Sequence, residues 1–316
     1  MGFEGLLGNE QLKTTLRAAR EKGRLGHFYL ISGPRGSGRH TLADLLAAAM
    51  LCKAPDGPCG VCKDCRKALG HSHPDYVVVD DPEKKTVPVD LIRQARSDLF
   101  VRPNEGARKI MLFPRAQDMG IPGQNALLKV LEEPPPYGAF LLITDNPETL
   151  LPTVRSRCVE LKLRALPEEL LRRTLSAEFP DAAPERIGAA IFRSGGYLGQ
   201  ARELLSGQGL SAHAREFAAA YAGRDAFALA KLLIPMEKWK RDALIPVLEE
   251  LLELTGQALL VRSGLAAAEP EAAALAAARG SGELMTACAA LKKAIEYARG
   301  NVSCAAISGW LSWELR

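Results

Sequence analysis

Short apolar runs, separated by helical patterns, constrain the first half of this chain more than any other feature. Strands that are buried on both faces of a sheet have this length and composition, because neither face needs polar side chains. The runs cover residues 27–31, 76–79, 110–113 and 140–144, and residues 159–163 form a fifth candidate. Strands that alternate with helices predict a doubly wound α/β domain with a parallel sheet.

The domain organisation follows from where this pattern stops. It ends near Arg164, and a Leu-Pro-Glu-Glu stretch just beyond predicts a hinge and a helix start. Only helical periods follow, and a Gly-Gln-Gly break at residues 207–209 predicts another boundary. The segment 264–282 predicts either a loose helix pair or a partly mobile loop. We predict an α/β domain over residues 1–164, a small helical domain over residues 165–208 and a helical domain over residues 209–316.

Charge and hydrophobicity exclude several classes of function. The chain has 41 basic and 37 acidic residues, and its net charge of +4 is too weak for tight nucleic-acid binding by the isolated chain. No apolar run approaches the length of a membrane span, and the first residues lack the features of a secretory signal. We therefore expect a cytoplasmic protein, without a membrane partner, whose cysteines are reduced.

A glycine-rich loop follows the first predicted strand and precedes a helical pattern. Gly33, four further residues and Gly38 give the glycine frame of a Walker A loop, with Gly36 between them. Such a loop curls its backbone N–H groups around a phosphate at the start of a helix. The loop is therefore a candidate site for a nucleotide.

The residues after this frame are wrong for ATP hydrolysis. Arg39 replaces the lysine that fits between the β- and γ-phosphates, and a guanidinium is larger and planar. His40 replaces the hydroxyl residue that would hold Mg²⁺. Thr41 comes one position late, so its side chain points about 100° away around the helix. Two interpretations stay open, a loop that binds ATP without hydrolysing it and a turn that never meets a nucleotide.

The strand at residues 110–113 also lacks catalytic acids. A Walker B strand ends in an aspartate for Mg²⁺ and an acid that orients the attacking water. Pro114 and Arg115 occupy these positions. Glu132 and Glu133 offer carboxylates, but they precede a run of three prolines at a helix end, where we expect a solvated face. We predict that the chain does not hydrolyse ATP.

Four cysteines lie within fourteen residues, at Cys52, Cys59, Cys62 and Cys65. The Cys59–Cys62 spacing, with Gly60 inside it, is typical of a knuckle whose sulfurs share one tetrahedral zinc ion. Four thiolate ligands leave no open coordination position, so a zinc module over residues 52–65 would be structural. The alternative is a redox-active pair with two spare thiols, which four clustered cysteines in a reduced protein disfavour.

Two arginines flank a serine just before the fifth predicted strand, at Arg155 and Arg157. Taken alone, these residues have an ordinary interpretation as solvated side chains or partners of surface acids. Arg157 is the centre of a Ser-Arg-Cys sequence at residues 156–158.

Together these features resemble the bacterial DNA polymerase III clamp-loader subunits, of the AAA+ type. The matching segments are residues 7–30, the four cysteines after the glycine-loop helix, residues 124–135 and the Ser-Arg-Cys at residues 156–158. The tau/gamma ATPase subunits of this family keep intact Walker motifs. The delta-prime subunits have degenerate motifs but keep the Ser-Arg-Cys arginine, and this sequence is similar to them. Gln200 also stands where the ATPases usually place an arginine.

The resemblance implies an AAA+ P-loop domain, a small helical lid domain and an all-α C-terminal collar domain. It also implies assembly with tau/gamma and delta subunits, which open a sliding clamp and place it on primer-template DNA. Arg157 would act in trans on the ATP site of a neighbouring subunit, an effect on the order of 10³–10⁵ in rate. The chain would be a stator without activity of its own, in a holoenzyme that is a DNA-directed DNA polymerase, a nucleotidyltransferase.

Two alternatives remain at this point. An active ATPase of the tau/gamma type would need other residues to replace the missing lysine, hydroxyl and acids. A zinc-stabilised DNA-binding module would need a basic face, whereas basic and acidic residues here are nearly balanced.

Overall fold

The computed structural model describes residues 2–206, 210–265, 270–300 and 302–315. By compactness the chain divides into two units. One unit comprises residues 1–171 with 194–201, and the other comprises residues 172–193 with 202–316. The whole sheet lies in the first unit, whereas the second has helices and no strand among its described residues.

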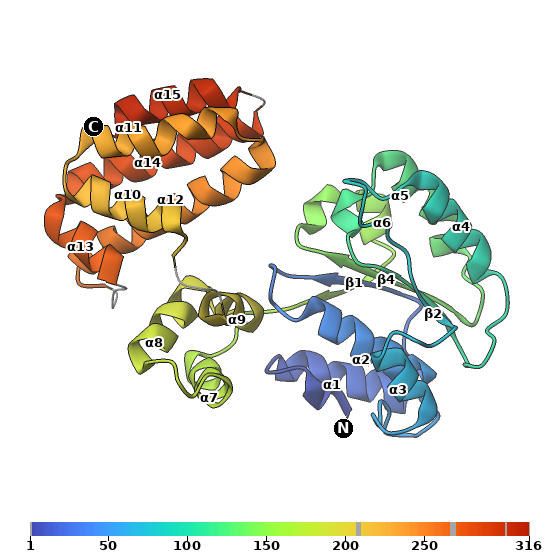
Figure 1. The fold of residues 1–316 in the computed structure, drawn as a ribbon. Helices are drawn as coiled ribbons and strands as arrows, with labels where there is room; N and C mark the ends of the chain where they lie inside the picture. The colour runs from blue at the N-terminus through green and yellow to red at the C-terminus, as the bar shows by residue number, and fades with distance from the viewer. Residues whose placement is uncertain (1, 207–209, 266–269, 301, 316) are drawn as a thin grey trace. The chain divides into compact units, whose positions relative to one another are not determined.

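The first unit contains one parallel sheet with the strand order β2-β3-β4-β1-β5 (Figure 1). The strands are β1 (Phe28–Ser32), β2 (Tyr76–Val78), β3 (Lys109–Phe113), β4 (Gly138–Thr144) and β5 (Val159–Lys162). In the register of the sheet, Leu30 lies opposite Leu142 and Ile31 lies opposite Leu161. All five predicted strands and the parallel sheet are confirmed.

Helices cover both faces of this sheet (Figure 1). One face carries α1 (Glu10–Glu21), α2 (Arg39–Leu51) and α3 (Lys63–Leu69), and the other carries α4 (Val89–Leu99), α5 (Ile121–Glu132) and α6 (Pro152–Arg155). Strand β1 contacts both hydrophobic cores, which explains why its apolar residues do not alternate with polar ones. Tyr29 and Ile31 pack into the first core, and Phe28 and Leu30 pack into the second. A parallel sheet with helices on both faces is the doubly wound α/β fold that the strand pattern predicted.

Three short 3-10 turns lie within the first unit, and three helices follow β5 in the sequence. The turns are η1 (Gly2–Gly5), η2 (Ala116–Asp118) and η3 (Pro147–Thr149), and the helices are α7 (Glu168–Glu178), α8 (Pro184–Arg193) and α9 (Leu198–Ser206). Helix α7 begins where the Pro-Glu-Glu sequence predicts a helix start. The predicted three-domain division stays a prediction, and its break at residues 207–209 lies outside the described residues.

The C-terminal region is a helical bundle around one hydrophobic core, which extends in sequence from Leu210 to Leu315. Its elements are α10 (Ala212–Ala222), α11 (Ala226–Leu233), η4 (Ile234–Lys238), α12 (Arg241–Arg262), α13 (Pro270–Ala278), α14 (Ser281–Arg299) and α15 (Cys304–Glu314). Within the segment 264–282, residues 270–278 are helical, and residues 266–269 lie outside the described part. None of the described helices combines the length and apolar character required to cross a bilayer.

A buried arginine joins three parts of this bundle. Arg279 is only 4% exposed, and its guanidinium stacks 4.1 Å from the ring centroid of Tyr221 at the end of α10. It also donates a hydrogen bond of 2.7 Å to the carboxylate of Glu283, in the first turn of α14. The backbone amide of Gly280 donates a hydrogen bond of 2.8 Å to the same carboxylate. These hydrogen bonds lower the pKa of Glu283 to about 2, and the bond from Gly280 has the largest effect.

Candidate functional site

The glycine-rich loop joins β1 to α2 at the edge of the sheet where the parallel strands end. Gly36 and Gly38 have φ angles of 76° and 94°, in the left-handed region that favours glycine. The first amides of α2 open onto this loop, because the first turn of a helix lacks helical acceptors. The hydroxyl of Ser37 is buried there and has no hydrogen-bond partner among the described residues. The backbone of the loop therefore fits a phosphate group.

The side chains at the start of α2 fit Mg-ATP poorly. Arg39 is half-buried, and burial lowers its pKa, an effect that the charge of Asp145 after β4 partly offsets. Burial, and then the charge of Arg39, also lower the pKa of His40, so this imidazole is neutral at neutral pH. Thr41 is exposed. The position that would hold Mg²⁺ therefore offers an imidazole, a poor ligand for this hard ion.

The start of α9 packs directly on the loop, within the same compact unit. The amide of Gly199 donates to the carbonyl of Gly36 over 2.9 Å, and the side-chain amide of Gln200 donates to the carbonyl of Arg35 over 2.8 Å. A Cβ atom on Gly36 would lie 2.5 Å from the backbone nitrogen of Gln200, and one on Gly199 would lie 2.6 Å from the Cα of Gly36. This close approach requires glycine at both positions, and Gln200 here binds the loop through a neutral amide.

The end of β3 carries an ion pair where an ATPase would place two acids. Pro114 follows the strand, and the next residue, Arg115, places Nη2 2.7 Å from Oδ1 of Asp80. Its Nε also donates to this carboxylate, over 3.1 Å, and its Nη1 lies 3.4 Å from Asp118. The hydrogen bonds to Asp80 raise the pKa of Arg115. A permanent cation thus stands where metal-binding carboxylates would be needed.

Arg157 lies near the start of β5, beside the C-terminal end of α5. Its Nη2 lies 2.7 Å from Oε1 of Glu132, and its Nη1 donates to the carbonyl of Thr153 over 2.9 Å. Arg155 has a different partner, Glu148, at 2.7 Å. Each arginine of the Arg-Ser-Arg sequence is therefore held by its own glutamate.

Arg157 and the glycine-rich loop lie at opposite ends of the parallel strands: Arg157 lies before the start of β5, and the loop follows the end of β1. Strand β5 runs parallel to β1, with Val159 opposite Tyr29. The loop begins four residues beyond Tyr29, and this strand length corresponds to about 13 Å. Arg157 precedes Val159, which adds to the separation. The sheet therefore does not bring the arginine to the chain's own phosphate loop.

A buried glutamine fixes the segment that leads to Arg157. Gln124 on α5 is 2% exposed, and its amide nitrogen donates to the carbonyls of Met119 and Thr149 over 2.9 and 3.2 Å. Its amide oxygen accepts from the backbone nitrogen of Leu151, over 2.7 Å, at the start of α6. The glutamine thus ties α5 to α6 through bonds that satisfy the buried amide.

Sequence reasoning missed the partners that hold these side chains. Asp80 belongs to no motif, and Glu132 was noted only as a solvated acid; the two lie 35 and 25 residues from the arginines that they bind. Gln124 belongs to the segment that carries the resemblance, but its hydrogen bonds give no periodic signal. Glu132 was expected on a solvated face, and its side chain is 54% exposed while it also pairs with Arg157.

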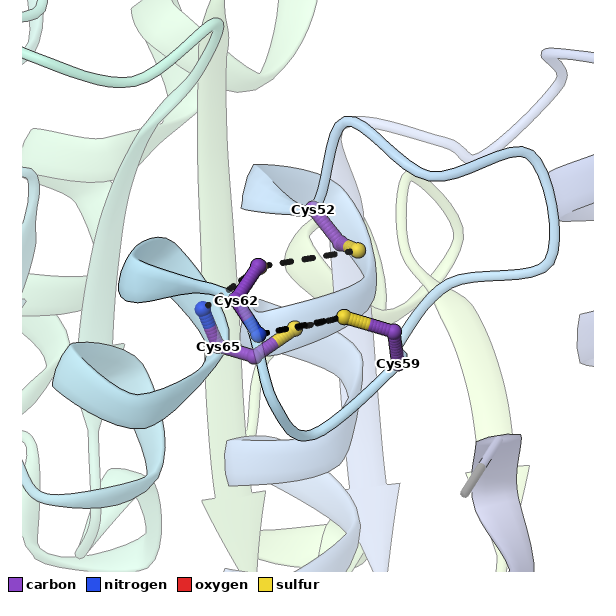
Figure 2. A group of neighbouring side chains, drawn as sticks. All are labelled: Cys52, Cys59, Cys62 and Cys65. Atoms are coloured by element: carbon purple, nitrogen blue, oxygen red, sulfur yellow. Dashed lines mark hydrogen bonds between the residues drawn. The ribbon is translucent and has the colours of Figure 1, made fainter.

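The four clustered cysteines lie where the end of α2 meets the turn before α3 (Figure 2). Their sulfur atoms all lie within 4.8 Å of one another. The Cys59 and Cys65 sulfurs are 3.9 Å apart, and those of Cys52 and Cys62 are 4.0 Å apart. Zinc–sulfur bonds of about 2.3 Å place the sulfurs of a tetrahedral site about 3.8 Å apart. The arrangement therefore fits a zinc ion without rearrangement of the backbone.

Backbone amides support this arrangement. The amide of Cys62 donates to the sulfur of Cys59, and the amide of Cys65 donates to the sulfur of Cys62, both over 3.3 Å. The first bond is the main reason that the pKa of Cys59 falls to about 6, whereas burial raises the pKa of Cys65. N–H bonds to sulfur stabilise thiolates, the form in which cysteine binds metal.

Comparison with known proteins identifies the family. A sequence model of the family described as DNA polymerase III, delta subunit, matches residues 8–167, half of the chain. The chain belongs to this family. Membership excludes the alternative of a zinc-stabilised DNA-binding module that is unrelated to clamp loaders.

Relatives include both kinds of clamp-loader subunit. The chain is 39% identical over 191 residues to DNA polymerase III subunit delta' of Pseudomonas aeruginosa, over 58% of this chain and 57% of that protein. It is 32% identical over 209 residues to the gamma/tau subunit of Mycobacterium tuberculosis, over 65% of this chain and 36% of that protein. The matches thus span little more than half of the delta' relative and about a third of the gamma/tau relative.

Two solved structures align with nearly the whole chain at low identity. A gamma subunit-related protein of Thermotoga maritima is 18% identical, covers 97% of this chain and 100% of its own, and has a TM-score of 0.48. The Bacillus subtilis DNA clamp loader delta protein is 11% identical, covers 96% and 98%, and has a TM-score of 0.39. Both TM-scores are low, so the fold assignment rests on the sheet order and its helices.

Proposed function

We propose that this chain is a non-hydrolysing, delta-prime-type subunit of the DNA polymerase III clamp loader. The observation that carries the proposal is the Arg115–Asp80 ion pair at the end of β3. Hydrolysis of ATP needs acids there to hold Mg²⁺ and orient water, and a guanidinium can do neither. An active ATPase of the tau/gamma type would need both acids, so this alternative is disfavoured.

Arg157 is the residue through which the subunit acts on its neighbours. It lies far from the chain's own phosphate loop, and its side chain is 35% exposed. A guanidinium can neutralise the charge that develops on the γ-phosphoryl oxygens during hydrolysis, when another subunit holds the nucleotide. Arg157 thereby serves as an arginine finger in trans for an adjacent tau/gamma subunit.

The rest of the chain supplies a rigid frame for that arginine. Cys52, Cys59, Cys62 and Cys65 hold a structural zinc ion between α2 and α3. The C-terminal bundle forms the collar that joins this subunit to tau/gamma and delta subunits. The assembly acts in the cytoplasm, where it loads the sliding clamp onto primer-template DNA, and this chain is its stator.

The proposal is tested by Mg-ATP binding and hydrolysis with the purified chain alone. We expect no phosphate release above the rate without protein, whether or not calorimetry detects ATP at the glycine loop. Steady turnover that is lost in an Arg39→Ala variant would show that the chain is a working ATPase and would overturn the proposal.

A further inference from the structure

The guanidinium of Arg157 is not free in the isolated chain. One terminal nitrogen binds the carboxylate of Glu132 at 2.7 Å, and the other donates to the carbonyl of Thr153 at 2.9 Å. The carboxylate offsets the positive charge of the arginine. An arginine in this state cannot offer its full charge to a phosphate.

Glu132 occupies an unusual place for an acid. It is the last residue of α5, and the backbone leaves the helix at Glu133, with φ −128° and ψ 73°. A carboxylate at the C-terminal end of a helix meets the negative end of the helix dipole, which is unfavourable. The cation of Arg157 offsets this cost. Each residue of the pair therefore gains from the other in the isolated chain.

The pair is also easy to break. The side chains of Arg157 and Glu132 are 35% and 54% exposed. Ion pairs at such positions are weak, because water and salt screen them. Contacts of arginine with a phosphate are often bidentate and stronger than a single carboxylate contact. A triphosphate presented by a neighbouring subunit can therefore displace Glu132 at little cost.

From this geometry we propose that Glu132 is a competing counter-ion, which holds Arg157 in a neutralised position until a neighbour's nucleotide displaces it. The inference rests on the proposed role of Arg157 in trans. Glu132 does not touch the nucleotide and acts only through the arginine. It sets the strength with which the arginine engages the neighbouring ATP.

The test is a Glu132→Gln substitution in the full chain, assembled with tau/gamma and delta subunits, sliding clamp and primed DNA. Glutamine keeps the shape of the side chain and removes its charge. Competition weakens the contact with bound ATP and with the transition state equally, so its loss should lower KM and leave kcat unchanged. We expect KM for ATP to fall by about two- to fivefold, the range that a weak exposed ion pair supports.

The chain offers a matched control. Glu148→Gln removes the same charge from Arg155, at the same 2.7 Å separation, and should leave both constants unchanged. In an Arg157→Ala background, Glu132→Gln should have no effect on KM. The thermal midpoint of each isolated chain verifies that every variant is folded.

The outcomes separate the two claims. If Arg157→Ala slows hydrolysis but Glu132→Gln behaves as wild type or lowers kcat, the counter-ion inference is wrong and the role of Arg157 stands. If the effect of Glu132→Gln persists without Arg157, the glutamate acts by another route and the inference is again wrong. If Arg157→Ala leaves hydrolysis unchanged, the proposed function fails and the inference falls with it.

Discussion

The Nη2 atom of Arg115 lies 2.7 Å from Oδ1 of Asp80, and Nε of the same guanidinium lies 3.1 Å from this oxygen. The pair joins the end of β3 to the loop after β2. Both polar groups of the pair are engaged with each other, so the contact holds these two loops together.

Asp80→Ala should destabilise the sheet unit. The side chains of Arg115 and Asp80 are 27% and 18% exposed, so the substitution leaves a partly buried cation without its main partner. We expect a loss of about 1–3 kcal/mol in the free energy of unfolding, measured with a chemical denaturant. Asp90→Ala is the control, because its pair with Arg93 is far more exposed, and it should change stability by less than about 0.5 kcal/mol. Equal effects of the two substitutions would contradict the structural role of Asp80.

Restoring the Walker A residues should not restore hydrolysis. In an Arg39→Lys and His40→Thr double variant the loop regains a lysine and a hydroxyl, but Arg115 still stands where the acids are needed. We expect no steady release of phosphate by the isolated variant. Turnover by this variant would mean that the acids lie elsewhere and that the end of β3 has been misinterpreted.

Arg157→Ala should leave assembly of the clamp loader intact and slow hydrolysis at the adjacent ATP site. The expected loss at that site is on the order of 10³-fold or more, the usual effect of an arginine finger. Single-turnover hydrolysis by the reconstituted complex, with clamp and primed DNA, measures it. Arg155→Ala is the control, because Arg155 pairs with Glu148 in the same segment and has no proposed role in hydrolysis.

Metal analysis of the purified chain should find about one zinc ion per chain. Cys65→Ser should abolish the bound zinc and lower the thermal midpoint, because Cys65 is fully buried beside α2. Cys288→Ser, far from the cluster in sequence and on α14, should keep the zinc. A folded wild-type chain without metal would refute the zinc assignment.

Glu283 should make the C-terminal bundle sensitive to acid. Its pKa of about 2 lies below the ordinary value near 4.3, so folding favours its ionised form. The stabilisation is therefore fully present above the ordinary pKa and is lost as the pH falls through about 2. Glu283→Gln should lower the thermal midpoint at about pH 7, and the difference from wild type should shrink between about pH 4 and pH 2. A difference that does not depend on pH would contradict the role of the carboxylate charge.

Much of the fold could be predicted from the sequence, because the strands are buried on both faces. The runs at β1, β3 and β4 lack polar interruptions, and so their positions are unambiguous. The cysteine cluster was predictable for a different reason, since four thiols at short spacing leave few geometries. The structure brings all four together, as the spacing indicated.

The contacts of the site could not be predicted in the same way. The bond between Gln200 and Arg35 joins residues 165 positions apart, and no local pattern encodes it. The Glu132–Arg157 pair depends on where α5 ends relative to the start of β5, which is a property of the folded sheet. The residue types alone indicated that the acids and the lysine of an ATPase are missing. The hydrogen-bond and ion-pair partners of the residues at these sites are seen only in the fold.

The contact between Gly36 and Gly199 has a consequence for synthesis of the chain on the ribosome. The glycine loop is complete by residue 38, yet the residues that pack on it follow more than 150 positions later. Until residues 194–201 have emerged, the nascent sheet unit lacks the segment that covers this loop. We expect a fragment that stops at residue 193 to keep its sheet but to leave the loop open to proteases, so maturation of this region waits for the later helix.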